Sequence, residues 1–326
     1  MPANVQTMAY YGDVPWHKLG TPIPKGVSAE QMIRAAGLDW QVDLRPARGA
    51  KEINKKGEFS RYEVVRVPRL NTKETEVLLG LVSRRYTPLQ NIEAFDFFNP
   101  IVGDKKAFFE TAGALGEGER IWVMAKMPDA MQIVPGDECL KYLLLSNTHS
   151  GDGSVIVKFT SVRVVCQNTL LMAMEDGQKA YRVRHSKQMQ FKLEELREFL
   201  AITQEVFLNA EQCFRRLAKI QMKETRLEQY FESVFSRSAV QKKNGVKPQR
   251  WGFLQEMFDG RPDLQIRGVR GTLWAAYNAI TRFEDYKQPQ QEEQPDQRLE
   301  RTWFGGGADI KLKALEKAKE LALIWN

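Results

Sequence analysis

The feature that most constrains the fold of this chain is a change of hydrophobic period near residue 190. Before this point, short apolar runs alternate with turn residues, as in Arg61–Leu70 (RYEVVRVPRL) and Ser154–Val165 (SVIVKFTSVRVV). From Leu193 onwards, apolar residues recur at a 3-4 spacing. Short apolar runs bounded by turns favour strands, and a period of 3.6 favours helices. The sequence therefore predicts an α+β protein, with a strand-rich part (1–190) followed by a helix-rich part (191–326).

Turn residues between the apolar runs predict hairpins in the first part. Three pairs of strands are expected: Asp39–Arg45 with Arg61–Leu70, Lys106–Ala114 with Glu119–Met127, and Leu140–Ser146 with Ser154–Val165. The last pair encloses NTHSGDG, whose glycines tolerate the positive φ of a tight turn. These connections predict a mainly antiparallel sheet that packs with helices.

Two helix starts are predicted from capping residues. After the expected strand Val77–Arg85, Thr87 is a suitable N-cap, Pro88 a suitable first residue, and Gln90 completes a capping box. Further along, Gln167 and Asn168 precede LLMAM, where they are expected either to cap a helix or to contact base edges.

The second part is predicted to be helical. A broad apolar stripe begins at Leu193, and this stripe either packs into the domain core or makes an oligomer contact. Two more helices are expected at Thr272–Tyr286 and Asp309–Trp325. Between them, KQPQQEEQPDQR has no apolar anchor, which predicts a mobile surface loop at about 287–301.

Charge and cysteine content narrow the classes of function. The chain has 48 Lys and Arg residues against 41 Asp and Glu residues, a formal charge of +7 that favours polyanionic partners. Three distant cysteines without a CxxC pair indicate neither a disulfide framework nor a thiolate zinc site. The first 20 residues have no basic segment followed by an apolar run, and no apolar run reaches about 18 residues, so neither secretion nor membrane spanning is expected. The expected location is therefore the cytoplasm, away from membranes.

Five sequence blocks occur together in this chain. They are PWHKLGT, SRRYTPLQNIEAFDF, LSNTHSGDGSVIVKFTSVRVVCQNTL, GTLWAAYNAITRFEDY and WFGGGADIKLKAL. In this order they resemble the phage/plasmid-like protein family described as domain of unknown function 932. The resemblance implies a setting on phages, plasmids or other mobile elements, and hence a role in DNA replication, recombination or counter-defence. The general plan also resembles that of phage single-strand annealing proteins, at the level of fold only.

Basic residues are the leading candidates for a binding site. Arg84 and Arg85 are expected to share a phosphate with the amides of the helix predicted at Thr87. A second group of basic residues is expected on one sheet face, with Tyr181 as a stacking platform for unpaired bases. This group comprises Lys158, Arg163, Arg182, Arg184 and Lys187. The stretch Arg237–Gly252 supplies a basic loop. The alternative in each case is an ordinary solvated surface. The nucleic-acid-binding candidates are Arg84, Arg85, Lys158, Arg163, Tyr181, Arg182, Arg184, Lys187, Lys242, Lys243 and Arg250.

Catalytic and metal sites are less well supported by the sequence. A Cys166 nucleophile with His149 or His185 would lie in an apolar run, where a buried structural thiol is more usual. Ligation of a metal by His17, His149 and Asp152 lacks a close ligand pair. The glycines of WFGGGADIKLKAL lack the GK[ST] of a phosphate-binding loop. Carboxylates for metal-dependent strand cleavage would be Glu93, Asp96, Asp104 and Glu110.

The sequence thus predicts a non-catalytic protein that binds single-stranded DNA, anneals strands in recombination, forms a homo-oligomer and needs no cofactor or metal. Such binding depends steeply on salt. The first alternative is a protein-interaction or counter-defence factor that engages a host protein through its helical part. The second is a metal-dependent nuclease.

Overall fold

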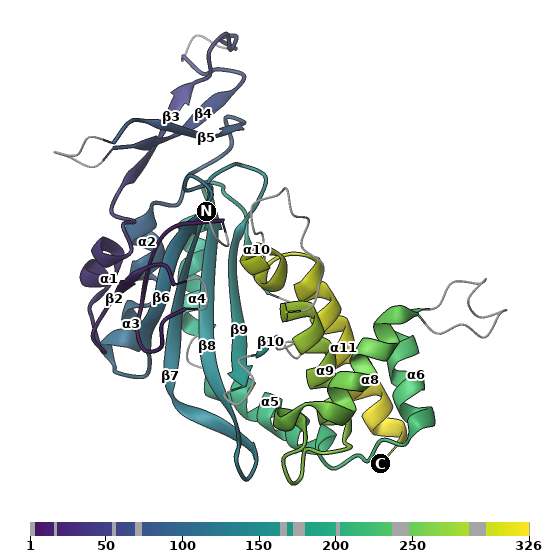
Figure 1. Ribbon diagram of the computed structural model, residues 1–326. Coiled ribbons are helices and arrows are strands. Elements are labelled where there is room, and N and C mark those ends of the chain that lie inside the picture. Colours follow the sequence, from purple (N-terminus) through teal and green to yellow (C-terminus); the bar gives the residue numbers. More distant parts are fainter. Residues whose placement is uncertain are drawn as a thin grey trace. The chain divides into compact units, whose positions relative to one another are not determined.

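The computed structural model describes residues 4–15, 18–53, 57–68, 74–163, 168–171, 180–199, 203–236, 248–286 and 298–325. It confirms the α+β class, because a large, mainly antiparallel sheet and a smaller sheet combine with many helices (Figure 1). The strands are β1 (Val5–Tyr10), β2 (Thr21–Pro22), β3 (Gln41–Pro46), β4 (Tyr62–Val67), β5 (Val77–Val82), β6 (Phe108–Leu115), β7 (Arg120–Val134), β8 (Asp137–Thr148), β9 (Val155–Arg163), β10 (Asn168–Leu171) and β11 (Tyr181–Val183). The helices are α1 (Ala29–Ala35), α2 (Asn91–Asp96), α3 (Asn99–Gly103), α4 (Met189–Phe199), α5 (Thr203–Leu217), α6 (Glu224–Val234), α8 (Gln249–Gly260), η3 (Pro262–Leu264), α9 (Leu273–Tyr286), α10 (Arg298–Trp303) and α11 (Gly306–Ile324).

The large sheet follows the predicted hairpins. Its strand order is β10-β9-β8-β7-β6-β1-β2, and β11 pairs with β9 off this path. The expected strands Lys106–Ala114 and Glu119–Met127 form the antiparallel pair β6–β7, and the next two expected strands are the neighbours β8 and β9. β1 joins antiparallel to β6 at one side, and the short β2 runs parallel to β1.

The small sheet contains the first predicted hairpin. β3, β4 and β5 pair antiparallel in sequence order, so the expected strands Asp39–Arg45, Arg61–Leu70 and Val77–Arg85 are confirmed with shorter bounds. An extra residue in β5 opposite β4 shifts the register, since Val64 faces Gly80 while Val65 faces Leu78. Such a bulge changes which side chains share a face.

Gly80 in β5 lies directly against the backbone of Ser150. A β-carbon at position 80 would overlap the Ser150 carbonyl oxygen, whereas one at Gly252 in α8 would meet no atom within 4 Å. We expect Gly80→Ala to lower the free energy of unfolding by about 1–3 kcal/mol through overpacking. Gly252→Ala should raise it by up to ~1 kcal/mol through helix propensity. Chemical denaturation measures both, and equal effects would contradict the close approach at Gly80.

The chain divides into two compact units. The first contains residues 1–128, 142–158 and 180–203, and the second contains residues 129–141, 159–179 and 204–326. The sequence suggests a single boundary near residue 190, and this division differs from it. Parts of β7, β8 and β9 belong to each of the two units, and α4 belongs to the first. The names "first unit" and "helical unit" are used for these two parts below.

The core of the helical unit is built around α9. Twelve of its residues are buried, among them Trp274 and Tyr277, whose rings pack against Phe214 of α5. Helix α9 packs against α8, α10 and α11 (Figure 1). The prediction of a helix at Thr272–Tyr286 is confirmed, and the one at Asp309–Trp325 is confirmed with an earlier start. The stripe from Leu193 belongs to two helices, α4 and α5, whose Leu193, Phe207 and Phe214 are buried.

Buried ion pairs connect the elements of this helical unit. Lys311 Nζ of α11 lies 2.8 Å from Asp285 Oδ1, and Arg301 Nη1 of α10 lies 3.0 Å from Glu284 Oε2. Both carboxylates belong to the last turn of α9. Each charge is thus neutralised by a partner on a neighbouring helix, as buried charges require.

Three of the local predictions are wrong. The helix after β5 begins at Asn91 and not at Thr87, and its N-cap is Gln90, whose amide donates to Glu93 Oε2 at 2.6 Å. Asn168 starts the strand β10, which pairs with β9, and so it caps no helix. Helix α10 starts at Arg298, inside the loop expected at 287–301, and residues 287–297 lie outside the described part of the chain.

Among the described residues, none of the helices is both long enough and apolar enough to cross a membrane.

Candidate nucleic-acid interface

Two basic segments that are distant in the sequence lie side by side in the first unit. The turn after β5 carries Arg84 and Arg85, and the segment between β11 and α4 carries Arg184 and Lys187. The Thr87 amide donates to the His185 carbonyl at 3.4 Å, and the His185 ring nitrogen Nδ1 lies 3.1 Å from the Thr87 carbonyl oxygen. These two contacts hold the segments together across 98 residues of sequence.

Two rings mark the centre of this junction. Tyr86 stacks on His185, with ring centroids 4.6 Å apart and an interplanar angle of 25°. Arg85 precedes Tyr86 and Arg184 precedes His185, so the stack joins the two segments that carry these cations. We call the exposed residues Arg84, Arg85, Arg182, Arg184 and Lys187 the basic surface.

The basic surface is only slightly neutralised within the protein. Arg84 Nη1 lies 2.9 Å from Glu58 Oε2, and both side chains are more than 40% exposed. Within the described part of the chain, the other four cations form no ion pair. Surface pairs of this kind contribute little stability, so Arg84 can exchange its carboxylate for another anion. Five exposed cations on two paired segments, with one carboxylate partner, are a suitable arrangement for a polyanion.

A buried polar cluster lies behind the stacked rings. His149 Nε2 lies 3.0 Å from Asn91 Oδ1, and Asn91 Nδ2 donates to the Leu38 carbonyl at 2.9 Å. Since Asn91 Oδ1 is an acceptor, His149 carries its proton on Nε2. Asn147 Nδ2 donates to the Leu89 carbonyl at 3.3 Å, and the Tyr86 hydroxyl donates to the Thr148 carbonyl at 3.4 Å. The cluster thus fixes β8, α2 and the turn that carries Arg84 and Arg85.

Burial keeps both histidines of this region neutral. It lowers the pKa of His149 to about 3, with a further contribution from the nearby His185. It also lowers the pKa of His185, against a smaller opposing effect of the hydrogen bond to Thr87. His185 Nδ1 donates to Thr87, so Nε2 presents a lone pair, and this buried atom has no hydrogen-bond partner among the described residues. Cationic forms of these rings are therefore disfavoured near neutral pH.

The predicted phosphate site at a helix start is not formed. The amide of Thr87 is used by His185, and the helix begins four residues later. Glu93 in its first turn caps Gln90 and also accepts a hydrogen bond from Gln190 Nε2 at 2.7 Å. Helix amides are therefore not available beside Arg84 and Arg85, and the Glu93 carboxylate caps the start of α2.

The structure places Lys158 and Arg163 in the interior and not on an exposed sheet face. Lys158 is 6% exposed and Arg163 is 0% exposed. In the helical unit, Arg163 Nε lies 2.6 Å from Asp137 Oδ1, and Arg163 Nη2 donates to the Asp263 carbonyl at 2.9 Å. The second oxygen of Asp137 accepts from Trp274 Nε1 at 2.8 Å. Arg163 is thus a structural cation, since its charge is compensated where water cannot reach.

The predicted stacking residue Tyr181 lies on the other face of the strand from its arginine neighbour. In β11, Tyr181 is paired with Val157 and Arg182 with Ile156. Since side chains alternate along a strand, Tyr181 points to the face opposite Arg182. Tyr181 therefore cannot stack a base between the side chains of Arg182 and Arg184.

The basic loop predicted in the second part is described only at its end. Lys242 and Lys243 lie outside the described residues, as do His17, Cys166 and Gln167. Arg250 is half-buried in α8, with its guanidinium 4.8 Å from the ring centre of Phe235 and 5.6 Å from that of Phe283. Its planar group thus packs on two aromatic rings of the helical unit.

The carboxylates expected for a nuclease are engaged separately. Besides Glu93, Asp96 accepts from Asn99 at 3.0 Å, Asp104 from Lys106 at 2.8 Å, and Glu110 from the Tyr142 hydroxyl at 2.6 Å. Asp152 accepts a hydrogen bond from Ser150. In the described ranges, no group of three His, Cys, Asp or Glu side chains is arranged to hold a metal ion.

Sequence reasoning missed Tyr86, His185 and Asn91 as parts of one site. Their only sequence signal is position, because Tyr86 follows Arg84-Arg85 and His185 lies between Arg184 and Lys187. The contact between His185 and the segment of Tyr86 and Thr87 joins residues that are distant in the sequence, so only the structure reveals it.

Comparisons with known proteins place the chain in a family. No curated protein and no solved structure matches it. The model of the family described as Domain of unknown function (DUF932) matches residues 78–303, about two thirds of the chain. This range contains the whole basic surface, α2, β8 and α9. The chain therefore belongs to the domain of unknown function 932 family.

Proposed function

We propose that this protein binds single-stranded DNA without catalysing a reaction, through the basic surface of its first unit. The observation that carries the proposal is the pairing of Thr87 with His185, which joins the segment that carries Arg84 and Arg85 to the segment that carries Arg184 and Lys187. Phosphates of a flexible strand are bound by such clusters of exposed cations, with release of counterions.

The role in the cell follows from this activity. A protein that holds single strands through their backbones suits annealing in recombination on a phage or plasmid, in the cytoplasm of the host and as a homo-oligomer. A nuclease is a weaker candidate, because its expected carboxylates each contact a different partner. The alternative is a protein-interaction or counter-defence factor, whose helical unit would bind a host protein.

The test compares two triple variants of equal charge change. Arg85→Glu, Arg184→Glu and Lys187→Glu reverse three cations of the basic surface. The control reverses three exposed cations of the helical unit, with Lys219→Glu, Arg267→Glu and Arg270→Glu. Fluorescence anisotropy with a 40-nucleotide strand measures the affinity. Three lost contacts at about 1 kcal/mol each predict roughly 100-fold weaker binding for the first variant.

The control variant should bind within a few-fold of the wild type. Its net charge equals that of the first variant, so a general effect of charge would weaken both equally. Equal weakening of the two variants, or none in either, would refute the proposed location of the site. In a further experiment the strand is incubated with the protein and magnesium, and a denaturing gel shows whether it is cleaved. The proposal predicts that the strand stays intact.

A further inference from the structure

One aromatic side chain of the first unit is exposed in the segment that follows the basic surface. Phe191 of α4 is 68% exposed, and no other aromatic residue in the described part of the chain is more than 38% exposed. Covering the apolar face of such a ring with a ligand is favourable. We propose that Phe191 stacks on a base of the bound single strand, and that this contact makes the basic surface prefer unpaired bases to a duplex.

Two buried neighbours fix the direction of Phe191 on its helix. Met189 and Leu193 lie one helical turn apart, are 1% and 5% exposed, and anchor α4. Successive side chains of an α-helix are about 100° apart, so Phe191 lies roughly 200° from both and points away from the core. The Gln190 amide donates to Glu93 Oε1 at 2.7 Å, which joins this turn of α4 to the first turn of α2. The backbone that carries the ring is thus held in place before any strand binds.

Cations accompany this ring along the chain. Lys187 of the basic surface precedes Phe191 by four residues, and Lys192 follows it directly. The Lys192 amide donates to the Gln188 carbonyl at 3.1 Å, so the chain between them is a helical turn. Lys187 and Phe191 therefore lie about one turn apart, and both lysines are exposed. Proteins that bind single strands combine cations, which hold the backbone, with exposed rings, on which bases stack.

The surroundings of Phe191 suit a nucleic-acid strand better than an apolar protein partner. Its exposed neighbours on α4 are the polar residues Gln190, Lys192 and Glu194. A stable protein interface buries about 800 Å² on each partner and has an apolar centre. Ile92 of α2 adds one further exposed apolar side chain. One ring and one isoleucine are a small centre for such an interface, whereas a single base is enough to cover one ring.

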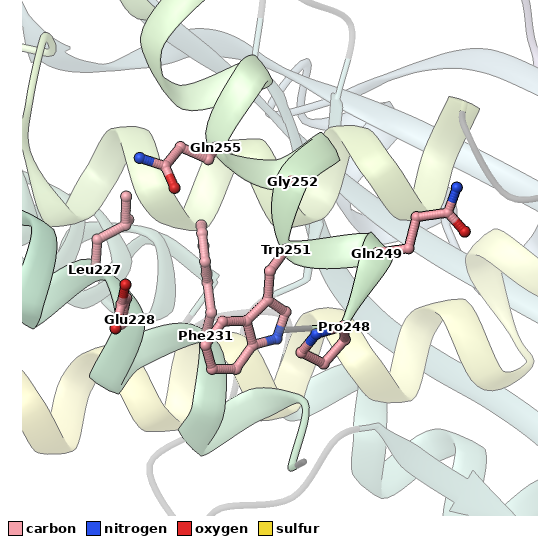
Figure 2. A pocket seen from close by; sticks show the side chains of 8 residues that line it. All are labelled: Leu227, Glu228, Phe231, Pro248, Gln249, Trp251, Gly252 and Gln255. Carbon is pink, nitrogen blue, oxygen red and sulfur yellow. The ribbon is translucent and has the colours of Figure 1, made fainter. Parts of the chain in front are cut away.

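Aromatic rings of the helical unit are placed differently. Figure 2 shows Phe231 and Trp251 side by side in the pocket between α6 and α8. Their side chains are 2% and 3% exposed, and their ring centroids lie 6.4 Å apart. Rings packed in this way have no free face for a base, whereas Phe191 presents its ring to solvent.

The inference rests on the proposed function and adds to it the choice between single and double strands. Cations alone hold the phosphates of either kind of strand. In a duplex the bases are stacked on each other and paired, so a ring on the protein surface does not reach their faces. Stacking on Phe191 therefore supplies a discrimination that charge does not.

The test compares three ligands by fluorescence anisotropy: the 40-nucleotide strand, its duplex, and a strand of the same length whose sugars carry no base. We expect Phe191→Ala to bind the normal strand about 10-fold more weakly than the wild type, the loss of one stacking contact. Its affinities for the duplex and for the base-free strand should change by less than about 2-fold. Its slope of log K against log salt should equal that of the wild type, because the ring neutralises no phosphate.

Three further variants serve as controls. Phe191→Tyr keeps a ring and should bind the normal strand as the wild type does, whereas Phe191→Leu keeps an apolar side chain without a π face and should resemble Phe191→Ala. Phe253→Ala removes a 38% exposed ring from α8 of the helical unit and should leave the affinity unchanged. Because Phe191 is exposed, its variants should unfold at the same denaturant midpoint as the wild type.

Four results would overturn the inference. Equal affinity of the wild type and Phe191→Ala for the normal strand would do so and leave the proposed function intact. An equal loss for all three ligands would show that Phe191 acts on the backbone site and not on bases. A lower mass of Phe191→Ala in light scattering, with unchanged affinity, would identify the ring as a contact between copies of the chain. No binding of any strand by the wild type would refute the proposed function, and this inference with it.

Discussion

Arg163→Met is expected to lower the free energy of unfolding by about 3–5 kcal/mol, the largest effect of any single change considered for this protein. Arg163 is fully buried and lies 2.6 Å from Asp137, whose carboxylate is also fully buried. Removing the guanidinium leaves that carboxylate with Trp274 Nε1 as its remaining hydrogen-bond donor among those described above. An uncompensated buried charge is costly, whereas methionine fills most of the vacated volume. Guanidinium denaturation followed by circular dichroism measures the loss.

Two comparisons isolate the charge effect in this experiment. Arg84→Ala, which breaks an exposed pair with Glu58, should cost less than about 1 kcal/mol. Adding Asp137→Asn to Arg163→Met should recover part of the loss, because the unpaired carboxylate is removed. If the double variant were less stable than Arg163→Met by the full cost of a second deletion, Asp137 and Arg163 would not be coupled. In its folded state, Arg163→Met should retain affinity for single strands, since Arg163 is not part of the basic surface.

Stability is expected to fall as the pH is lowered from about 6.5 towards 4.5. Burial lowers the pKa of His149 to about 3, while the unfolded chain has an ordinary histidine pKa near ~6.5. Below the unfolded value, the unfolded state takes up a proton that the folded state excludes. This group thus contributes fully above pH ~6.5, and its contribution decreases by about 1.4 kcal/mol per pH unit until the folded pKa is reached. Between pH 6.5 and 4.5 the loss from His149 is about 2 kcal/mol.

His149→Gln tests the origin of this pH dependence. Glutamine can still donate to Asn91 Oδ1 but does not titrate, so the variant should be less stable than the wild type at pH 7.5 and approach it at pH 4.5. Carboxylates titrate in both proteins, so their effect on stability cancels in the difference between the two denaturation midpoints. His185→Gln retains His149 and should keep most of the slope. A constant difference between wild type and His149→Gln across this range would contradict the assignment.

Elements with local signals could be predicted from the sequence. The hairpins β3–β4, β6–β7 and β8–β9 follow from short apolar runs and turn residues between them. Helix starts were harder to predict from the sequence. Thr87 is a residue type that often caps helices, but its amide donates to the His185 carbonyl instead. The pairing partner is distant in sequence, so no local pattern reveals it.

The binding site was only partly predictable, because a charged residue does not show in the sequence whether it is buried. Arg163, Lys158 and Lys311 look like any other surface cation, yet all three lie in the interior. Arg84, Arg85, Arg184 and Lys187 proved to be exposed, and the contact that unites them was not foreseen. What the sequence lacks is the pairing of distant segments, and this pairing joins the two segments that carry the basic residues.

The most direct test of the account is the salt dependence of binding to a 40-nucleotide single strand. Anisotropy titrations of the wild type and of the Arg85→Glu, Arg184→Glu and Lys187→Glu variant are made from ~50 to ~200 mM salt, where electrostatic binding changes most. The account predicts tight binding at low salt, a steep loss with salt, and a slope of log K against log salt that is smaller by about 2 in the variant. No affinity of the wild type at ~50 mM salt, or identical slopes for both proteins, would contradict it.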